Sequence, residues 1–203
     1  MTPEQLHCFL KVVHPRHRLL FKLLATSGLR ISEALALQWK HVTLGARPSI
    51  QVRRAIVRRR VHPPKSKHGR RTVPLSHKLA EDLVSTRGLA GPDDLLFSSR
   101  AGTPLLPENM RRRVLKPAAE EADASWAGFH TFRHTCASML FARGANAVQV
   151  QRWLGHHSPA FTLATYVHLL RDDLGDPIAL EEELRPSVRR YVDRAPSSTV
   201  LAP

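Results

Sequence analysis

The sequence predicts a mainly α fold that carries one small three-stranded antiparallel β-sheet, so its class is α+β. Apolar residues recur at helical spacing through most of the first 170 residues. Residues 49–75 differ, because they alternate in polarity, are rich in β-branched side chains and contain turn residues. With 203 residues, of which 42% are hydrophobic, the chain is long enough for one domain with a buried core.

Capping residues and apolar spacing locate the helices. Thr2, Pro3 and Glu4 are typical of a helix start, so a first helix should run to about Val13 and end at Pro15. The remaining helices are expected at 17–26, 29–39, 76–87, 107–122, 130–143, 146–154 and 159–169. Residues 88–107 hold several glycine and proline turn signals and should be mostly loop.

Three segments are expected to form the sheet. Residues 49–57 make the first strand, 58–64 the second after a tight turn, and 71–75 the third. Pro64 and Pro74 should lie at strand ends or on an edge, where a proline removes no ladder hydrogen bond. The sheet therefore interrupts the helical pattern early in the chain.

The cysteine and tryptophan residues are expected inside. Cys8 and Cys136 lie in apolar helical patterns and should be buried, reduced thiols, because two cysteines are too few for the disulfide framework of a small secreted chain. Trp39, Trp126 and Trp153 are expected to anchor the core. The N-terminus shows no signal-peptide pattern, and no run of ~20 apolar residues could span a bilayer. We therefore expect a cytoplasmic protein without a membrane partner.

The charge balance indicates a polyanionic partner. Thirty-one lysines and arginines oppose 17 acidic residues, which gives a formal net charge of +14. No acidic residue lies between Glu33 and Glu81, although twelve basic residues do. A block of one sign across a whole hairpin favours contact with a sugar-phosphate backbone, and a merely solvated basic surface is the alternative. The residues expected to make this contact are Arg53, Arg54, Arg58, Arg59, Arg60, Lys65, Arg70 and Arg71.

Three segments hold side chains suited to phosphoryl transfer, which needs a nucleophile, cations around the phosphate oxygens and an acid for the leaving oxygen. Arg30 follows a glycine turn at a predicted helix start, where anions already bind well, and Glu33 is close enough to hold it. His130 and Arg133 share one face of a predicted helix. Taken alone, the segment of Arg30 and Glu33 is equally consistent with an ordinary surface Arg-Glu pair.

The third segment ends one helix and supplies a tyrosine. Gly155 is a typical helix stop, His156 follows it, and Tyr166 comes ten residues later. A tyrosine on an amphipathic helix is by itself more often a core residue than a nucleophile. Its place downstream of the other two segments is what favours a chemical role.

These segments resemble the signature of a known family. The order "SGLRISEALAL", "HTFRHTCASML" and "WLGHHSPAFTLATYVHL" is similar to the arginine, histidine-x-x-arginine and leucine-glycine-histidine boxes and the downstream tyrosine of tyrosine recombinases. The resemblance covers roughly residues 1–170, which implies a catalytic domain of that fold. No N-terminal core-binding domain is expected before it in this chain. Residues 171–203 are expected to form a C-terminal helix or tail, and their partly apolar stripe is interpreted as an oligomerisation segment, with a frayed tail as the alternative.

The resemblance implies a role for each residue of the boxes. Tyr166 attacks the scissile phosphate and forms a 3′-phosphotyrosine bond, while Arg30 and Arg133 stabilise the transition state. Lys67, near the hairpin turn, protonates the 5′-oxygen, with Lys65 as the alternative. The supporting roles are those of His130 in proton transfer from the tyrosine, His156 on a non-bridging oxygen and Glu33 behind Arg30. The surrounding cations are also expected to favour the phenolate of Tyr166, since an unperturbed phenol has a pKa of about 10.

The resemblance also implies partners and an activity. The expected function is site-specific recombination of double-stranded DNA in a nucleoid-associated setting, by a tetramer on two duplexes. No cofactor is expected and no metal, although His130 and His134 have the i, i+4 spacing of a metal-binding helix. The alternatives are a DNA-binding remnant without recombinase activity and strand relaxation like that of a type IB topoisomerase.

Overall fold

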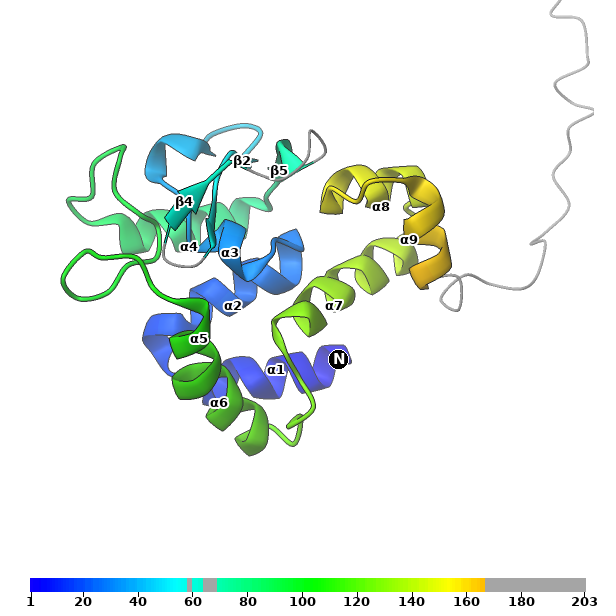
Figure 1. Cartoon of the computed structure of the whole chain (residues 1–203), viewed down its shortest axis with the longest axis horizontal. Helices are drawn as coiled ribbons and strands as arrows, with labels where there is room; N and C mark the ends of the chain where they lie inside the picture. Colours follow the sequence, from blue (N-terminus) through cyan, green and yellow to red (C-terminus); the bar gives the residue numbers. More distant parts are fainter. Residues whose placement is uncertain (58–59, 64–68, 167–203) are drawn as a thin grey trace, which may run out of the picture. The chain divides into compact units, whose positions relative to one another are not determined.

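The computed structural model describes residues 1–57, 60–63 and 69–166, and within them the chain is mainly helical with small antiparallel sheets (Figure 1). The predicted fold class is therefore confirmed. The helical elements are α1 (Pro3–Val12), α2 (Pro15–Ser27), α3 (Ile31–Ala34), the 3-10 turn η1 (Trp39–His41), α4 (His77–Arg87), α5 (Pro107–Met110), the π-helical turn η3 (Arg111–Leu115), α6 (Lys116–Glu121), α7 (Phe129–Ala142), α8 (Ala147–Leu154) and α9 (Pro159–Tyr166). The strands are β1 (Val42–Thr43), β2 (Ser49–Val52), β3 (Ala55–Val57), β4 (Arg60–His62) and β5 (Arg71–Pro74).

Local capping explains the helices that were predicted correctly. At α1, the Thr2 hydroxyl accepts from the Gln5 backbone at 3.2 Å and Gln5 returns the bond to the Thr2 backbone at 3.0 Å. Ser76 and Asn146 cap α4 and α8 in the same sense. Pro15 ends α1 as expected and is also the first residue of α2.

The predicted helix over 29–39 is wrong, because α3 covers only Ile31–Ala34. Beyond it the backbone pairs with the loop 88–107 instead of with itself. The Leu37 carbonyl accepts from Leu96 at 3.0 Å, and the Trp39 backbone donates to Asp94 at 3.1 Å. Apolar spacing in this segment therefore reflects burial under a loop, which overrides helix propensity.

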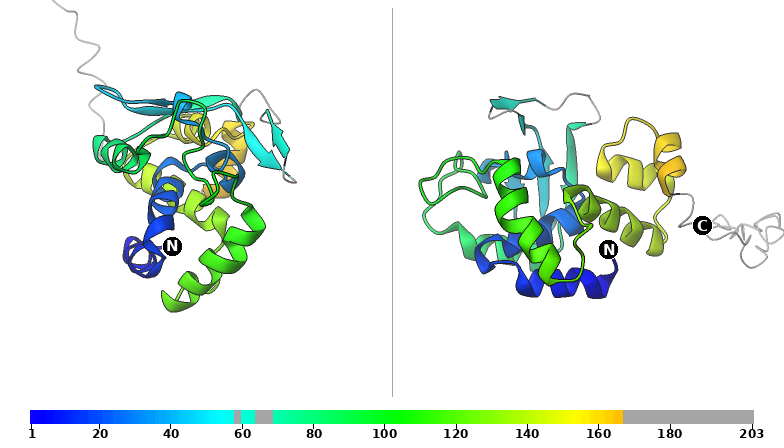
Figure 2. Two further views of the ribbon diagram at one scale, coloured as in Figure 1. Left: turned by 90° about the vertical axis from the view of Figure 1, so that its left-hand side faces the viewer. Right: turned by 60° about the horizontal axis from the view of Figure 1, so that its bottom comes forward.

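The sheet differs from the prediction in its strands. The strand expected at 49–57 divides into β2 and β3, which belong to different sheets. The three-stranded sheet has the order β1-β2-β5, and its first strand, β1, was not predicted. The strand expected at 58–64 appears, over its described residues, as β4, which pairs with β3 in a separate hairpin that projects from the domain (Figure 2). Pro74 ends the edge strand β5 and faces Ser49, as expected.

The helix predicted at 107–122 is continuous in direction but changes type. Between α5 and α6, the Lys116 backbone donates to the Arg111 carbonyl, five residues back, and so forms a π turn. Pro117 follows at once, and a proline lacks the N–H that an α-helix would use there. The helices predicted at 76–87, 130–143 and 146–154 are confirmed as α4, α7 and α8, and that at 159–169 as far as Tyr166.

The core lies where α2 packs on α7, and it sets the position of the later helices (Figure 1). Phe9, Phe21 and Phe132 meet there with ring centroids 5.0 to 5.2 Å apart, and Phe9 makes a T-shaped contact with each of the other two rings. A second cluster joins α7 to α8 and α9, and Trp153 packs against both clusters. The loop 88–107 carries only isolated bridges, as predicted.

Two of the residues expected in the core are exposed. The side chain of Trp126 is 60% exposed, in the turn before α7, and Cys8 lies on the exposed face of α1. Trp39 and Cys136 are buried as predicted, and Trp153 is partly buried. Within the described residues, no helix combines the length and the apolar character that crossing a membrane requires.

Candidate active site

Arg133 connects two of the segments that the sequence singled out. Its side chain is buried, and its two Nη atoms donate to the Gly28 carbonyl at 2.6 Å and the Leu154 carbonyl at 2.8 Å. Gly28 lies two residues before Arg30, and Leu154 two residues before His156. A single guanidinium on α7 therefore fixes the end of α2 and the end of α8 at one place.

Glu33 holds a second network beside it. The carboxylate is buried and accepts from the Arg30 backbone and from Arg30 Nη1, both at 3.0 Å. Arg71 Nη2 and Nη1 donate to the two carboxylate oxygens at 3.0 and 3.3 Å. The side chain of Arg30 remains 42% exposed, so it is held by Glu33 and still open to a ligand.

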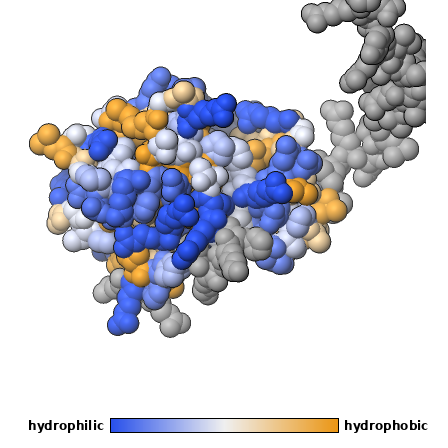
Figure 3. Space-filling view, turned by 90° about the horizontal axis from the view of Figure 1, so that it is seen from above, coloured by the Kyte–Doolittle hydropathy of each residue, from blue (hydrophilic) through white to orange (hydrophobic). Residues whose placement is uncertain are grey.

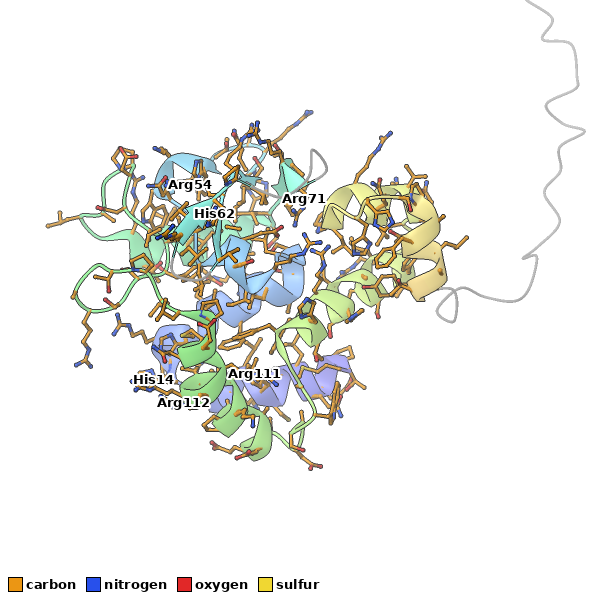
Figure 4. All side chains as sticks on the ribbon, in the orientation of Figure 1. His14, Arg54, His62, Arg71, Arg111 and Arg112 are labelled. Atoms are coloured by element: carbon orange, nitrogen blue, oxygen red, sulfur yellow. The ribbon has the colours of Figure 1, made fainter. Side chains whose placement is uncertain are left out.

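Arg71 corrects the sequence analysis, which placed it on the DNA-contacting surface. Its side chain is only 6% exposed and turns inward from β5, and its Nε donates to the Trp153 carbonyl at 2.8 Å (Figure 4). The alternation of side chains along the strand could have predicted this inward position, because Arg71 shares its face with the buried Val73 and Leu75. Arg71 therefore links Glu33 to the end of α8.

The clustered cations set the protonation of the network. Burial would raise the pKa of Glu33, but the charge and hydrogen bonds of Arg71, with those of Arg30, outweigh it and lower that pKa. Burial and the charges of Arg30 and Arg71 lower the pKa of Arg133 to about 10. Glu33 is therefore a carboxylate and Arg133 a cation at neutral pH.

His156 is a neutral imidazole in the same field. Burial first, and then the charges of Arg133 and Arg30, lower its pKa to about 4. Its Nδ1 lies 2.8 Å from the Thr162 hydroxyl, and its carbonyl accepts from Gln151 at 2.6 Å. The first contact orients the ring, and the second holds its backbone after the left-handed turn at Gly155. Nε2 is therefore the ring nitrogen left for a ligand.

Tyr166 lies at the end of α9, only 3% exposed. Its ring is nearly parallel to that of His156, with centroids 6.4 Å apart, and it also packs against Phe141 at 5.8 Å. Burial raises the pKa of Tyr166 although the charge of Arg133 opposes the rise. This differs from the sequence expectation, since the cations do not outweigh burial and the free protein holds a neutral phenol.

The phenol has a partner that the sequence analysis missed. The Tyr166 hydroxyl lies 2.8 Å from His134 Nδ1, and His134 was not among the residues expected to act in the chemistry. His130, which was expected to act on the tyrosine, is exposed one turn earlier on α7. Thirty-two residues separate His134 from Tyr166, so only the packing of α9 beside α7 reveals the pair. In the part of the chain that the structure describes, no three potential metal ligands cluster.

The remaining predicted DNA contacts fall into two groups. Arg53, Arg60 and Arg70 are exposed, and Arg54 is half-buried with its Nη1 bonded to the Gln38 side chain at 2.6 Å. Figure 3 shows strongly hydrophilic side chains gathered on the face above the sheets of Figure 1. Lys67, its alternative Lys65, Arg58 and Arg59 lie outside the described residues.

The fold and the meeting of Arg30, Arg133, His156 and Tyr166 define the class of tyrosine recombinase catalytic domains. A sequence model of the phage integrase family matches residues 1–172, and the chain belongs to that family.

Individual relatives agree with this assignment. The chain is 28% identical to the ICEBs1 integrase of Bacillus subtilis over 82% of its own length and 50% of the relative's. It is 33% identical to the tyrosine recombinase XerD of Pseudomonas aeruginosa over 79% of the chain and 52% of the relative. The chain therefore spans about half the length of the curated relatives it matches. The Tn1549 transposon integrase, solved in complex with circular intermediate DNA, has the same fold, with a TM-score of 0.70 at 22% identity over 91% of this chain and 66% of that one.

Proposed function

We propose that this chain is the catalytic part of a site-specific recombinase that cleaves and rejoins double-stranded DNA through a 3′-phosphotyrosine bond on Tyr166. The observation that carries the proposal is the pair of hydrogen bonds from Arg133 to the carbonyls of Gly28 and Leu154. They bring the segments of Arg30 and His156 to one place, where Tyr166 stacks on His156. A cluster of cations beside a tyrosine is what phosphodiester transfer requires.

The proposal assigns each group a function in the transfer. The Tyr166 oxygen attacks phosphorus, a bond to the 5′-oxygen breaks, and negative charge accumulates on the non-bridging oxygens. Arg30 is held by Glu33 but remains partly exposed, and a guanidinium matches two phosphate oxygens at once. Arg133 contributes a buried cation, and His156 a neutral imidazole that donates from Nε2. In the reverse direction the 5′-hydroxyl attacks the phosphotyrosine, so rejoining requires no nucleotide energy.

Protonation of the leaving oxygen is assigned to Lys67, with Lys65 as the alternative, and this assignment rests on the family resemblance. An ammonium on the hairpin would complete the set with a general acid. The result is a metal-independent site without a cofactor.

The basic hairpin face supplies the DNA contacts in this proposal. Among the solved structures of the same fold, that of the Tn1549 integrase contains DNA. In this chain, the block of basic residues is the surface proposed to contact the DNA backbone. The contacts are assigned to Arg53, Arg54, Arg58, Arg59, Arg60, Lys65 and Arg70.

Domain organisation and assembly are further parts of the proposal. Residues 1–170 are assigned to the catalytic domain and 171–203 to a segment that docks on a neighbouring copy. Four copies would then act on two duplexes, and the protein would be cytoplasmic and associated with the nucleoid. Light scattering of the chain with and without a DNA duplex, before and after deletion of 171–203, tests this assembly.

A plasmid relaxation assay tests the chemistry. Purified protein is incubated with negatively supercoiled plasmid in EDTA, beside Tyr166→Phe and, as a matched control, Tyr191→Phe at the chain's other tyrosine. Wild type and Tyr191→Phe should relax the plasmid and form a protease-sensitive adduct, whereas Tyr166→Phe should do neither. Sequencing of the DNA attached to the adducts then identifies the preferred cleavage site.

The outcomes separate the alternatives. DNA binding without any adduct indicates a binding remnant. Adducts and relaxation without strand exchange between two duplexes indicate an activity like that of type IB topoisomerases. Equal relaxation by Tyr166→Phe and wild type would refute Tyr166 as the nucleophile.

A further inference from the structure

His134 is placed to act on the reacting atom of the proposed chemistry. Its Nδ1 lies 2.8 Å from the Tyr166 hydroxyl, within hydrogen-bond distance, and the two ring centroids are 5.5 Å apart at an angle of 56°. His134 comes from α7, one residue after Arg133, and Tyr166 from α9. The contact therefore depends on the same packing that joins Arg133 to the end of α8.

The surroundings of Tyr166 make a proton acceptor necessary. The phenol is buried between Phe141 and His156, and burial raises its pKa further above the neutral range although Arg133 opposes this. A neutral phenol is a weak nucleophile, because attack on phosphorus requires its proton to leave. The neighbouring cations therefore do not suffice to deprotonate the phenol, and a group that accepts its proton is required.

The surroundings of His134 keep it able to accept. Burial first, and then the charges of His130, Arg133 and the N-terminal amine, lower the pKa of His134, so its imidazole is neutral at neutral pH. With its own proton on Nε2, which is the nitrogen away from the phenol, Nδ1 carries a free lone pair. The phenol O–H then donates to it along the observed contact.

We propose that His134 is a catalytic residue of strand cleavage, and that its Nδ1 takes the proton of the Tyr166 hydroxyl as the phenol oxygen attacks phosphorus. This inference rests on the proposed function of Tyr166. It gives His134 the proton-transfer role that the family resemblance implied for His130, whose side chain is exposed one turn away.

The step balances without any further reactant. The bond between the Tyr166 oxygen and phosphorus forms, and the bond from phosphorus to the 5′-oxygen breaks. The phenol proton moves to His134 Nδ1, and the 5′-oxygen takes a proton from the general acid assigned to Lys67. On rejoining, the imidazolium of His134 returns its proton to the phenol oxygen that leaves.

The first test replaces the imidazole by a group that keeps the hydrogen bond. In His134→Asn, the amide oxygen lies near the position of Nδ1, so it can hold the phenol but cannot carry its proton away. The substrate is a duplex that contains the preferred cleavage site, as identified by sequencing the DNA of the covalent adducts. Its single-turnover cleavage should slow by roughly 10²-fold or more. His7→Asn, at an exposed histidine of α1, is the matched control and should cleave like wild type.

A modified substrate separates the two ends of the reaction. Replacing the bridging 5′-oxygen by sulfur creates a leaving group that needs no proton. Lys67→Ala should recover on this substrate, whereas His134→Asn should stay slow because the phenol still needs a base. The rate of wild type should also fall as the pH drops through the lowered pKa of His134, and this acid limb should flatten in His134→Asn.

Folding of the variant is checked by its urea midpoint and by binding of the same duplex, and added imidazole should partly restore cleavage by His134→Ala. Cleavage by His134→Asn at the wild-type rate, beside an inactive Tyr166→Phe, would overturn this inference and leave the proposed function standing. Faster cleavage would show that His134 restrains the tyrosine, and recovery on the sulfur substrate would place it at the leaving group. Activity of Tyr166→Phe would overturn the proposed function itself.

Discussion

At the residue scale, Arg71 joins three segments that are distant in the sequence. Its guanidinium pairs with both oxygens of Glu33 and donates to the Trp153 carbonyl. Since Glu33 also holds Arg30, Arg71 is a positioning residue of the candidate site and does not itself face a substrate. It thus differs from its neighbour Arg70, which is exposed.

Removal of Arg71 should therefore cost far more stability than removal of Arg70. Arg71→Ala leaves the buried Glu33 carboxylate with Arg30 as its remaining charged partner, and breaking a buried pair typically costs about 3–5 kcal/mol. Arg70→Ala should change the free energy of unfolding by less than about 0.5 kcal/mol. Urea denaturation measures both, and equal stabilities would contradict the role of Arg71.

His156 makes stability depend on pH in a defined window. Its pKa in the folded chain is lowered to about 4 from the ordinary 6.5, so between these values the unfolded chain binds more protons. The free energy of unfolding should therefore fall as the pH drops from 6.5 toward 4. Above pH 6.5 this group should add nothing to the pH dependence of that free energy. In urea melts across this window, His156→Gln should show a shallower decline than wild type. An unchanged slope would mean that the imidazole is charged in the folded state.

At the scale of elements, the site is a junction of helix ends. Gly28 ends α2 in the left-handed conformation, with φ +64°, and its carbonyl accepts from Arg133. A Cβ on Gly28 would lie 2.3 Å from Leu154 Cδ2 and 3.2 Å from Cys136 Sγ. Both neighbours are buried, so α2, α7 and α8 approach this closely only because residue 28 is a glycine.

Gly28→Ala should accordingly destabilise the protein through both conformation and crowding. Gly144→Ala is the matched control, because Gly144 also has a positive φ, +82°, but a Cβ there meets nothing within 4 Å. The control isolates the conformational cost of about 1 kcal/mol, and overpacking should add about 1–3 kcal/mol at Gly28. Thermal or urea unfolding of the pair measures the difference. Equal losses would show that the three helix ends can separate without cost.

At the scale of the whole molecule, the net charge of +14 governs association with a polyanion. Each phosphate neutralised by a basic side chain releases counterions, so affinity falls with salt along a slope proportional to the number of contacts. The exposed arginines of the hairpin are the side chains assigned to these contacts.

The salt dependence of DNA binding should therefore reveal the loss of a single phosphate contact when one basic residue is replaced. Arg60→Ala should reduce the slope of log affinity against log salt by about 0.9, the value for one phosphate contact. Lys11→Ala, at the exposed end of α1, should leave the slope unchanged. Fluorescence anisotropy of a duplex of random sequence measures both, and equal slopes would remove Arg60 from the proposed interface.

The sequence alone determined the fold class, the capped helices and the box residues. Thr2, Ser76 and Asn146 begin their helices through bonds to residues three positions along, so a short window contains the whole interaction. Arg30, Arg133, His156 and Tyr166 are likewise recognised from the order and spacing of the sequence segments that contain them.

Only the tertiary structure decided the early end of α3, the partner of the Arg71 side chain and the pairing of His134 with Tyr166. Each depends on a partner far along the chain: a loop backbone for Leu37, Glu33 for Arg71 and α9 for His134. Apolar spacing and charge indicate that a residue prefers burial or water, but they do not identify the group it will meet. Those partners are fixed by how the helices pack, which is a property of the folded molecule.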